Sequence, residues 1–147
     1  MILKYISIPE LNFAKSWEDG SNKIKGLNSF EKVMTIFWLL GPLIYLIERD
    51  PADLWLTLIS MIFLLRCIKK KDWVWTSQIW FKSALALWFF GLFSAFTSAD
   101  PFFTFQQGFV WIRFPLYVAA AQAWLAKDRD IRILMLLSML ILSLIHI

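Results

Sequence analysis

Apolar and charged residues are strongly segregated along this chain. Five stretches contain no charged residue, and all of the charged residues lie before the first stretch or in the connections between the stretches. A soluble amphipathic helix has polar residues on one face at every turn, whereas the stretch SALALWFFGLFSAFTSA has no such face. The pattern therefore predicts an all-α fold, a polytopic bundle of transmembrane helices with four full spans and a truncated fifth. The uncharged stretches are residues 33–47, 54–65, 83–99, 114–126 and 133–147.

The distribution of basic residues orients the predicted spans. Counted between the predicted spans, they cluster before the first span and in the second and fourth connections, whereas the first and third connections, at residues 48–51 and 100–101, contain only Arg49. Cytoplasmic loops of membrane proteins carry an excess of Lys and Arg. We therefore expect a polar cytoplasmic segment over residues 1–32, followed by a transmembrane region over residues 33–147. The predicted spans are about 33–47, 52–68, 79–99, 102–126 and 131–147.

Three kinds of local motif predict where helices begin or bend. Asn28 is followed three positions later by an acidic residue, which fits an N-cap, so the first helix should start there. Asp50-Pro51 and Asp100-Pro101 each join a capping aspartate to a proline suited to the first helical position. These two motifs should open the second and fourth spans. Gly41-Pro42 predicts a kink in the first span.

The composition excludes several classes of chemistry. The 147 residues are 59% hydrophobic and include nine Trp and 14 Phe, which is well above globular usage. Cys67 is the only cysteine, which excludes an internal disulfide and a cysteine zinc site. The sequence contains no P-loop, no HExxH motif and no dinucleotide fingerprint. We therefore predict neither a cofactor nor a metal.

The basic clusters point to membrane lipid rather than to nucleic acid as a partner. They are short and adjoin the predicted spans, whereas nucleic-acid-binding proteins carry one basic groove or stripe. The net charge of +4 and the run Lys69–Lys71 favour attraction to anionic lipid. Trp73, Trp75 and Trp80 lie in the same connection and fit an aromatic belt at the level of the lipid headgroups.

One charge lies inside a predicted span. Between Asp100 and Lys127 there are 26 residues, of which only Arg113 is charged at neutral pH. A charge near the middle of a span costs roughly 2.5 kcal/mol or more, so it is usually functional or paired. Two residues later, Pro115 cannot donate the helical hydrogen bond to the carbonyl of Trp111. Three interpretations of Arg113 are open: contact with an anionic substrate, a structural partnership with helix carbonyls or with an acid on another span, and a position at the membrane interface.

A second polar residue lies on the same predicted span. Gln106 is seven residues before Arg113, so on a continuous helix the two side chains would share a face. We predict that Arg113 and Gln106 bind substrate, in a pocket that opens outward and takes an anionic group such as a phosphate. Interhelical hydrogen bonding is the alternative for Gln106. No acidic residue lies deep in another predicted span, so an internal ion pair would require Asp53. No catalytic residue is predicted.

Two segments resemble the N-terminal half of the bacterial O-antigen ligase family, which includes related O-antigen polymerases. They are LGPLIYLIERDPADLWLTLISMIFLLR at residues 40–66 and SADPFFTFQQGFVWIRFPLYVAAAQAWL at residues 98–125. The resemblance covers roughly residues 30–142. It consists of the hydropathy, the outer Asp-Pro turns and the Trp-Ile-Arg-Phe-Pro segment, and no catalytic signature is matched.

The resemblance implies a multi-pass glycosyltransferase of the bacterial inner membrane. Such a protein moves an O-antigen-type polysaccharide from an undecaprenyl-diphosphate carrier to lipid A-core at the periplasmic face, without metal or nucleotide. The resemblance also implies that essential arginine and histidine residues belong to a later half, which agrees with a chain that ends within its fifth uncharged stretch. We therefore expect an N-terminal part that is inactive alone, with the missing C-terminal half as its partner. Two alternatives are a fragment of a transporter or flippase, and a small membrane scaffold without chemistry.

Overall fold

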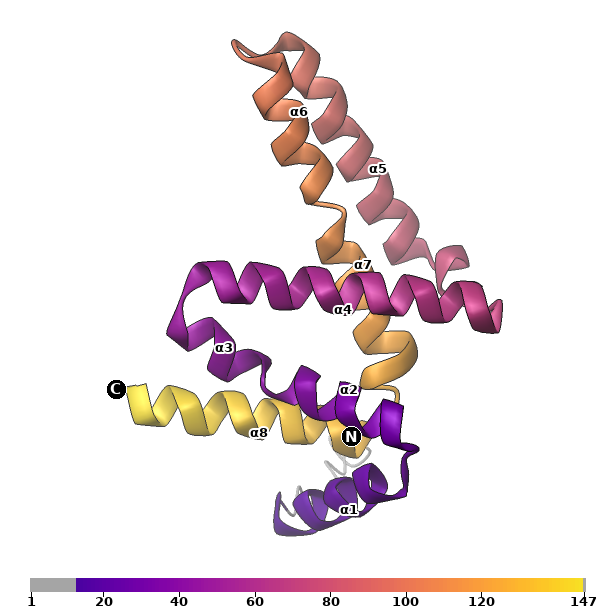
Figure 1. Cartoon of the computed structure of the whole chain (residues 1–147), viewed down its shortest axis with the longest axis vertical. Helices are drawn as coiled ribbons and strands as arrows, with labels where there is room; N and C mark the ends of the chain where they lie inside the picture. Colours follow the sequence, from indigo (N-terminus) through magenta and orange to yellow (C-terminus); the bar gives the residue numbers. More distant parts are fainter. Residues whose placement is uncertain (1–12, 147) are drawn as a thin grey trace, which may run out of the picture. The chain divides into compact units, whose positions relative to one another are not determined.

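The computed structural model describes residues 13–146, and this part of the chain consists of helices and turns without any strand, as predicted (Figure 1). Residues 1–12 of the predicted polar segment and Ile147 of the last predicted span lie outside the described residues. The chain divides into two compact units. The two ends of the chain, up to Pro42 and from Asp128, form one unit, and Leu43–Lys127 form the other.

The first unit is built from the helices at the two ends of the described chain. They are α1 (Phe13–Gly26), α2 (Ser29–Leu39) and α8 (Arg129–His146). α1 lies within the segment that was predicted only as polar, so the sequence interpretation missed this helix. Trp17 and Ile24 are seven residues apart and share a helix face, which is the signal that could have found it. α1 is amphipathic, with basic residues in its last turn, where the helix dipole favours cations.

Two of the predicted local motifs in this region are confirmed. The side-chain oxygen of Asn28 caps α2, because it accepts hydrogen bonds from the N–H groups of Phe30 at 2.9 Å and Glu31 at 3.4 Å. The expected kink at Gly41-Pro42 is also present. The helix stops at the end of α2 and resumes as α3 (Gly41–Ile47), with a bend of 42° between the two.

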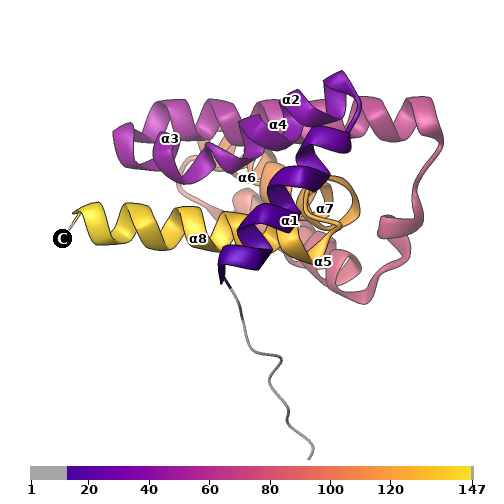
Figure 2. The ribbon, with the colours of Figure 1, turned by 90° about the horizontal axis from the view of Figure 1, so that it is seen from below.

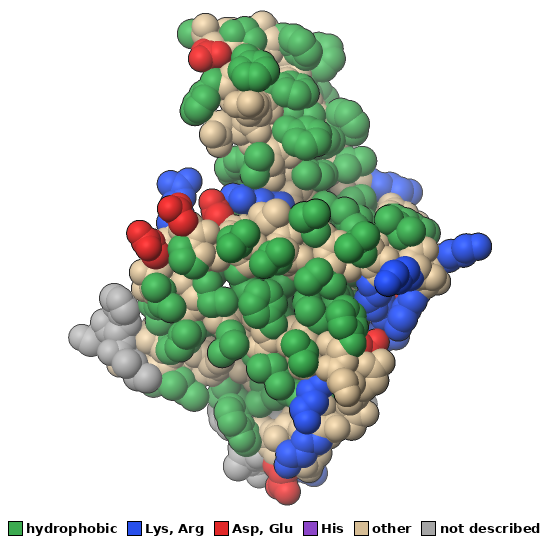
Figure 3. Space-filling model, in the orientation of Figure 1, with side chains coloured by type: hydrophobic (Ala, Val, Ile, Leu, Met, Phe, Trp, Pro, Cys, Tyr) green, Lys and Arg blue, Asp and Glu red, His purple; other side chains and the backbone are tan. Residues whose placement is uncertain are grey.

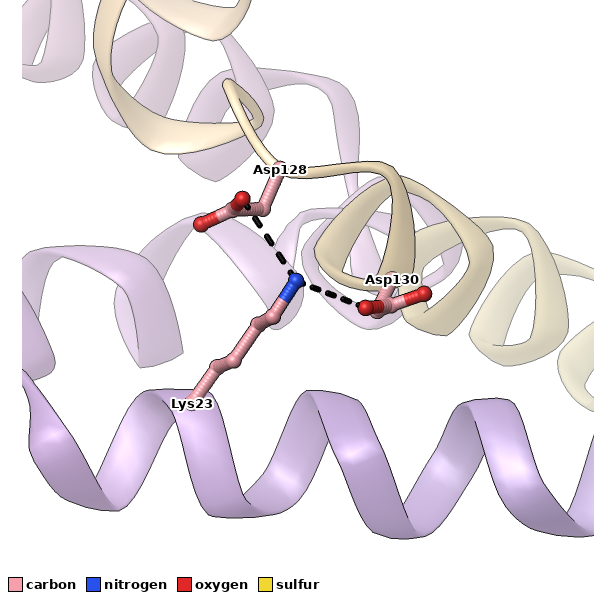
Figure 4. Close-up of polar contacts among 3 residues, drawn as sticks. All are labelled: Lys23, Asp128 and Asp130. Carbon is pink, nitrogen blue, oxygen red and sulfur yellow. Dashed lines mark hydrogen bonds and ion pairs between the residues drawn. The ribbon is translucent and has the colours of Figure 1, made fainter.

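α1 packs against the first turns of α8, and Figure 2 shows the two helices crossing there. Gly20 allows the close approach, since a Cβ atom at this position would lie 2.6 Å from Leu134 Cδ1. The Lys23 ammonium group then bridges two carboxylates, at 2.7 Å from Asp130 and 3.5 Å from Asp128 (Figure 4). The Asp130 carboxylate that accepts this hydrogen bond, with Asp128 beside it, raises the pKa of Lys23 above its ordinary value.

The second unit contains the long helix α4 and a hairpin of broken helices. Figure 1 shows α5 and α6 running side by side in opposite directions, and α7 packs against α4. In chain order the elements are α4 (Arg49–Lys70), η2 (Val74–Ser77), α5 (Ile79–Ser94), η3 (Ala95–Thr97), α6 (Pro101–Val110), α7 (Arg113–Ala120) and the π-helical turn η4 (Ala121–Leu125).

The two Asp-Pro motifs behave differently. The Asp100 side chain caps α6 as predicted, because it accepts the N–H of Phe103 at 3.1 Å and a proline follows it. The predicted cap by Asp50 is wrong. α4 already begins at Arg49, with Glu48 as an N-cap whose side chain makes no capping hydrogen bond. Asp50 therefore lies in the first turn of the helix, where its charge still favours the positive end of the helix dipole.

The helix over the fourth predicted span, residues 102–126, is interrupted, and the span itself stays a prediction. α6 ends at Val110 and α7 starts at Arg113, so the helix is interrupted between them. The C-terminal part is then wound as a π-helix over Ala121–Leu125, closed by the N–H of Ala126 on the carbonyl of Ala121 at 2.8 Å. Breaks of this kind occur where a proline or a π-bulge disturbs the hydrogen-bond ladder.

Two described helices are long and apolar enough to cross a membrane, or three if the bent pair α2 and α3 is counted as one span. They are α4 and the combined stretch α5–η3, over Ile79–Thr97. Of the most apolar 18-residue segment of α5–η3, only 11% is buried within the molecule, against 39% of the corresponding segment of α4. The exposed side chains of α5 include Leu87, Phe90 and Phe93, each more than 70% exposed. The finer count of four full spans and a fifth stays a prediction.

Candidate functional site

The turn between α6 and α7 is shaped by Pro115. Proline has no N–H, so it cannot bond to the carbonyl of Trp111. That carbonyl is nevertheless satisfied, because the N–H of Phe114 reaches it at 3.1 Å. The Trp111 carbonyl beside Arg113 is therefore not left free. It accepts a hydrogen bond from the residue three positions later instead of four, as in a 3₁₀ turn. The tightened turn makes Arg113 the first residue of α7.

One face of α4 holds Arg113 at three points. Asp53, Thr57 and Ser60 are spaced four and three residues apart, so they line the same side of the helix. Arg113 Nη2 lies 2.8 Å from Asp53 Oδ1, and Nη1 lies 3.5 Å from Thr57 Oγ1. The Ser60 hydroxyl lies 3.0 Å from the backbone carbonyl of Arg113. Asp53 thus forms the internal ion pair that the sequence had left as an open alternative.

The surroundings of the Asp53–Arg113 pair explain why the two charges need each other. The Arg113 side chain is 19% exposed and that of Asp53 is 37% exposed, so neither is fully hydrated. Arg113 also stands at the positive end of the α7 dipole, which disfavours a cation there. The Asp53 carboxylate offsets both effects. The guanidinium carbon lies 5.4 Å from the ring centroid of Phe114, within cation–π range.

The pairing leaves part of the guanidinium group without a partner. Asp53 contacts Nη2 alone, and Arg113 Nε is buried with no hydrogen-bond partner. An arginine can offer Nε and Nη2 together to a carboxylate or phosphate, in a bidentate arrangement. The contact in this structure uses one half of that fork. The unpartnered Nε is the feature that distinguishes this pair from a fully satisfied structural salt bridge.

A pocket of about 450 Å³ adjoins the pair. Its walls carry two acidic and two basic side chains, which nearly cancel in charge, together with polar and aromatic groups. A pocket with this balance suits a polar or zwitterionic group, and it suits an anion only if an acidic side chain moves away from its cation. The lining residues are Tyr45, Glu48, Arg49, Ala52, Asp53, Gln107, Val110, Trp111, Arg113 and Phe114.

The structure places the two predicted binding residues differently. Arg113 lines the pocket, whereas Gln106 is exposed and is not among the lining residues. The shared face predicted for the two required a continuous helix, and the break after α6 removes that condition. Gln107 lines the pocket instead. A register argument on an unbroken helix could not have found Gln107, and substrate binding by Gln106 stays a prediction.

A second, apolar groove of about 540 Å³ lies between α5 and the α6–α7 segment. It shares Gln107, Trp111 and Phe114 with the charged pocket, so the two cavities are neighbours. The hairpin is fastened beside it, where Trp88 Nε1 donates a hydrogen bond to the carbonyl of Gly108 at 2.9 Å. The result is a charged pocket next to an apolar one within the second unit.

The described residues contain no group of three or more His, Cys, Asp or Glu side chains that could hold a metal ion. Comparison with protein-family models, with curated proteins and with solved structures finds no match to this chain. The resemblance to the O-antigen ligase family therefore stays an expectation from the sequence. What the site offers chemically is a half-engaged guanidinium group, its carboxylate partner, and two adjoining cavities.

Proposed function

We propose that this chain is an integral protein of the bacterial inner membrane, with its N-terminus in the cytoplasm. We further propose that it forms the N-terminal part of a glycan transferase of the O-antigen ligase type. Such an enzyme moves polysaccharide from an undecaprenyl-diphosphate carrier to lipid A-core at the periplasmic face. In this proposal the chain supplies one wall of the site, and the missing C-terminal half supplies the catalytic groups.

The distribution of apolar and charged groups supports membrane insertion. Between Ala84 and Phe93 every exposed residue of α5 is apolar, which is unusual for a soluble monomer. Figure 3 shows acidic and basic side chains together at the start of α4 and basic ones at its end. The end of α4 carries Lys69 and Lys70, and Lys71 follows, whereas Glu48, Asp50 and Asp53 lie at its start. This asymmetry agrees with an α4 whose C-terminal end faces the cytoplasm.

The observation that carries the proposed substrate class is the half-engaged guanidinium group of Arg113. A phosphate oxygen pair can take Nε and Nη2 together once Asp53 releases Nη2. The adjoining apolar groove suits the hydrocarbon part of a lipid-linked substrate. Pairing with Asp53 supports a structural role for Arg113 equally well, so the experiment must separate binding from stability.

Membrane topology can be tested first. We expect a reporter fused after Asp100 to report a periplasmic position and one fused after Lys70 to report a cytoplasmic position. The chain should also remain in the membrane pellet after extraction with alkaline carbonate. Release of the chain by carbonate, or the opposite reporter pattern, would reject the membrane proposal.

The role of Arg113 is tested by expressing the longest open reading frame that contains this chain. We expect Arg113→Ala and Arg113→Lys to lower transfer of polysaccharide to lipid A-core, because lysine keeps the charge but loses the bidentate fork. Arg129→Lys, at an exposed position at the start of α8, is the matched control. Transfer at the wild-type level in both Arg113 variants, at equal expression, would reject a substrate role. A downstream sequence without further spans and without a large outer loop would reject the ligase assignment.

One observation favours a second candidate, a transporter or flippase. Both the α2–α3 pair and the α6–α7 segment are broken helices. Discontinuous helices form the substrate sites of many transporters. An inverted repeat of this arrangement in the downstream sequence would favour the transporter, whereas transfer activity that depends on Arg113 would favour the ligase.

A further inference from the structure

Helix α4 also carries Arg66, which does not line the charged pocket described above. Arg66 lies near the end of α4, more than three turns beyond Asp53. Its guanidinium carbon lies 5.1 Å from the ring centroid of Trp124, which belongs to the π-helical turn η4. Phe63, one turn earlier on α4, stacks on the same Trp124 ring with the centroids 6.5 Å apart. Arg66 is thus held over an aromatic surface.

The aromatic surface extends to the start of α5. Trp75 of η2 lies 5.2 Å from Phe63 and 4.6 Å from Phe81, centroid to centroid. These rings join α4, η2, α5 and η4 at one corner of the second unit. Trp75 and Phe81 are both buried, so the corner is packed rather than loose. The rings therefore support one side of Arg66, while the residue as a whole stays part-exposed.

Arg66 lacks acceptors for its hydrogen bonds. Its Nε and Nη1 atoms are buried, and neither has a hydrogen-bond partner in the described part of the chain. Trp80, next to Phe81, has a buried Nε1 in the same condition. A buried donor without an acceptor costs about 1–3 kcal/mol, and more when it is charged. Such groups in folded proteins usually meet a water, an ion or a ligand.

The electrostatic setting of Arg66 favours an anion. Lys69 and Lys70 are three and four residues further along α4, so they share its face. Lys71 follows as the left-handed cap of the helix, and Asp72 is the acidic group that comes next in the chain. The corner therefore carries four basic side chains against one acidic side chain over residues 66–72.

We propose that the Arg66 guanidinium group binds the phosphate of an anionic phospholipid at the membrane boundary. Arginine and phosphate form paired, charge-assisted hydrogen bonds, and the lysines of the same face add attraction to an anionic leaflet. Trp73, which is exposed and whose ring centroid lies 6.0 Å from that of Trp75, suits the headgroup level of a bilayer. This inference depends on the proposed membrane insertion, but not on the proposed glycan transfer or on Arg113.

The test uses the full chain, purified in detergent, and native mass spectrometry with added phosphatidylglycerol or phosphatidylcholine. We expect the wild type to bind phosphatidylglycerol more tightly than phosphatidylcholine. Arg66→Lys should weaken phosphatidylglycerol binding about tenfold, which corresponds to the loss of one charge-assisted hydrogen bond. Lys69→Arg, which also keeps the charge, is the matched control and should change the affinity less than about twofold.

The outcomes separate the competing explanations. Equal binding of phosphatidylglycerol by Arg66→Lys and the wild type would overturn the proposal, because attraction by charge alone does not distinguish lysine from arginine. Displacement of the lipid by millimolar inorganic phosphate would overturn the assignment to lipid. A general loss of structure in the variant is measured separately, as a lower midpoint of thermal unfolding than that of the wild type. Weaker lipid binding at an unchanged midpoint supports the proposal, and weaker binding only together with a lower midpoint would overturn it. If the chain resists carbonate extraction and shows no such preference, this inference fails and the membrane proposal stands.

Discussion

The Asp53–Arg113 contact should stabilise the packing of α4 against α7, and a double-mutant cycle can measure how strongly. The perturbations are Asp53→Asn, Arg113→Gln and the two together. Each change removes a charge; asparagine keeps the size of aspartate, whereas glutamine is shorter than arginine. The coupling free energy between the two positions then isolates the pair from the other contacts of each residue.

The structure bounds the size of this coupling. A hydrogen bond to a charged group contributes about 1.5–3 kcal/mol, whereas fully exposed ion pairs contribute about 0.2–1 kcal/mol. Asp53 is 37% exposed and Arg113 is 19% exposed, so solvent screens part of the attraction. We expect a coupling of about 1–1.5 kcal/mol, between these two ranges. The single change Arg113→Gln should cost about 2 kcal/mol, because it also removes the approach to Thr57 and the stacking on Phe114.

The assay is unfolding of the purified chain by sodium dodecyl sulfate in mixed micelles, followed by far-ultraviolet circular dichroism. Asp19→Asn and Lys25→Gln form a control cycle, because both residues are exposed on α1. The control coupling should lie within about 0.5 kcal/mol of zero. A coupling of the same small size for Asp53 and Arg113 would refute the structural role of the pair. A coupling far above about 3 kcal/mol would show that the pair is more deeply buried than its exposed fractions indicate.

Three further predictions concern other contacts. Gly20→Ala should lower the thermal stability by about 1 kcal/mol, although alanine usually stabilises a helix, because the new methyl group meets Leu134. A variant as stable as the wild type would contradict the tight packing. Because Asp130 raises the pKa of Lys23, the contact should stabilise the folded chain fully at neutral pH and lose this effect only above pH 10.5, the ordinary pKa of lysine. Unfolding of the wild type and of Lys23→Gln across this pH range will test it. Asp100→Ala should cost about 1 kcal/mol in chemical unfolding, whereas Asp100→Asn should cost little because asparagine also caps helices.

Features that depend on a few neighbouring residues were predictable from the sequence. The caps at Asn28 and Asp100 need only a side-chain oxygen and an N–H two or three residues later, so the local pattern is sufficient. The kink at Gly41-Pro42 follows in the same way from the missing proline N–H. The cap at Asp50 failed because a helix can begin one residue earlier without any side-chain cap, as α4 does at Arg49.

Features that depend on packing were only partly predictable. The carbonyl that Pro115 leaves without its usual partner was expected to be free, but the backbone rearranged locally and satisfied it. That rearrangement broke the helix and changed which glutamine, Gln107 rather than Gln106, faces the pocket. The sequence could name Asp53 as the one candidate partner for Arg113. It could not pair them, because 60 residues separate the two and their contact depends on how α7 packs on α4.

The same pair of residues can separate a binding site from a structural contact, because the two roles predict different signs for Asp53→Asn. If Arg113 serves only to hold α7 on α4, both Asp53→Asn and Arg113→Gln should lower stability and function together. If Arg113 binds a phosphate, Asp53 competes with that phosphate for Nη2, and a competition of about 1–1.5 kcal/mol weakens binding about tenfold. Asp53→Asn should then lower stability but tighten phosphate-lipid binding by up to about tenfold, while Arg113→Gln lowers both. Measured affinities that fall in step with stability for both variants would leave the ion pair as a structural contact and remove Arg113 from the substrate site.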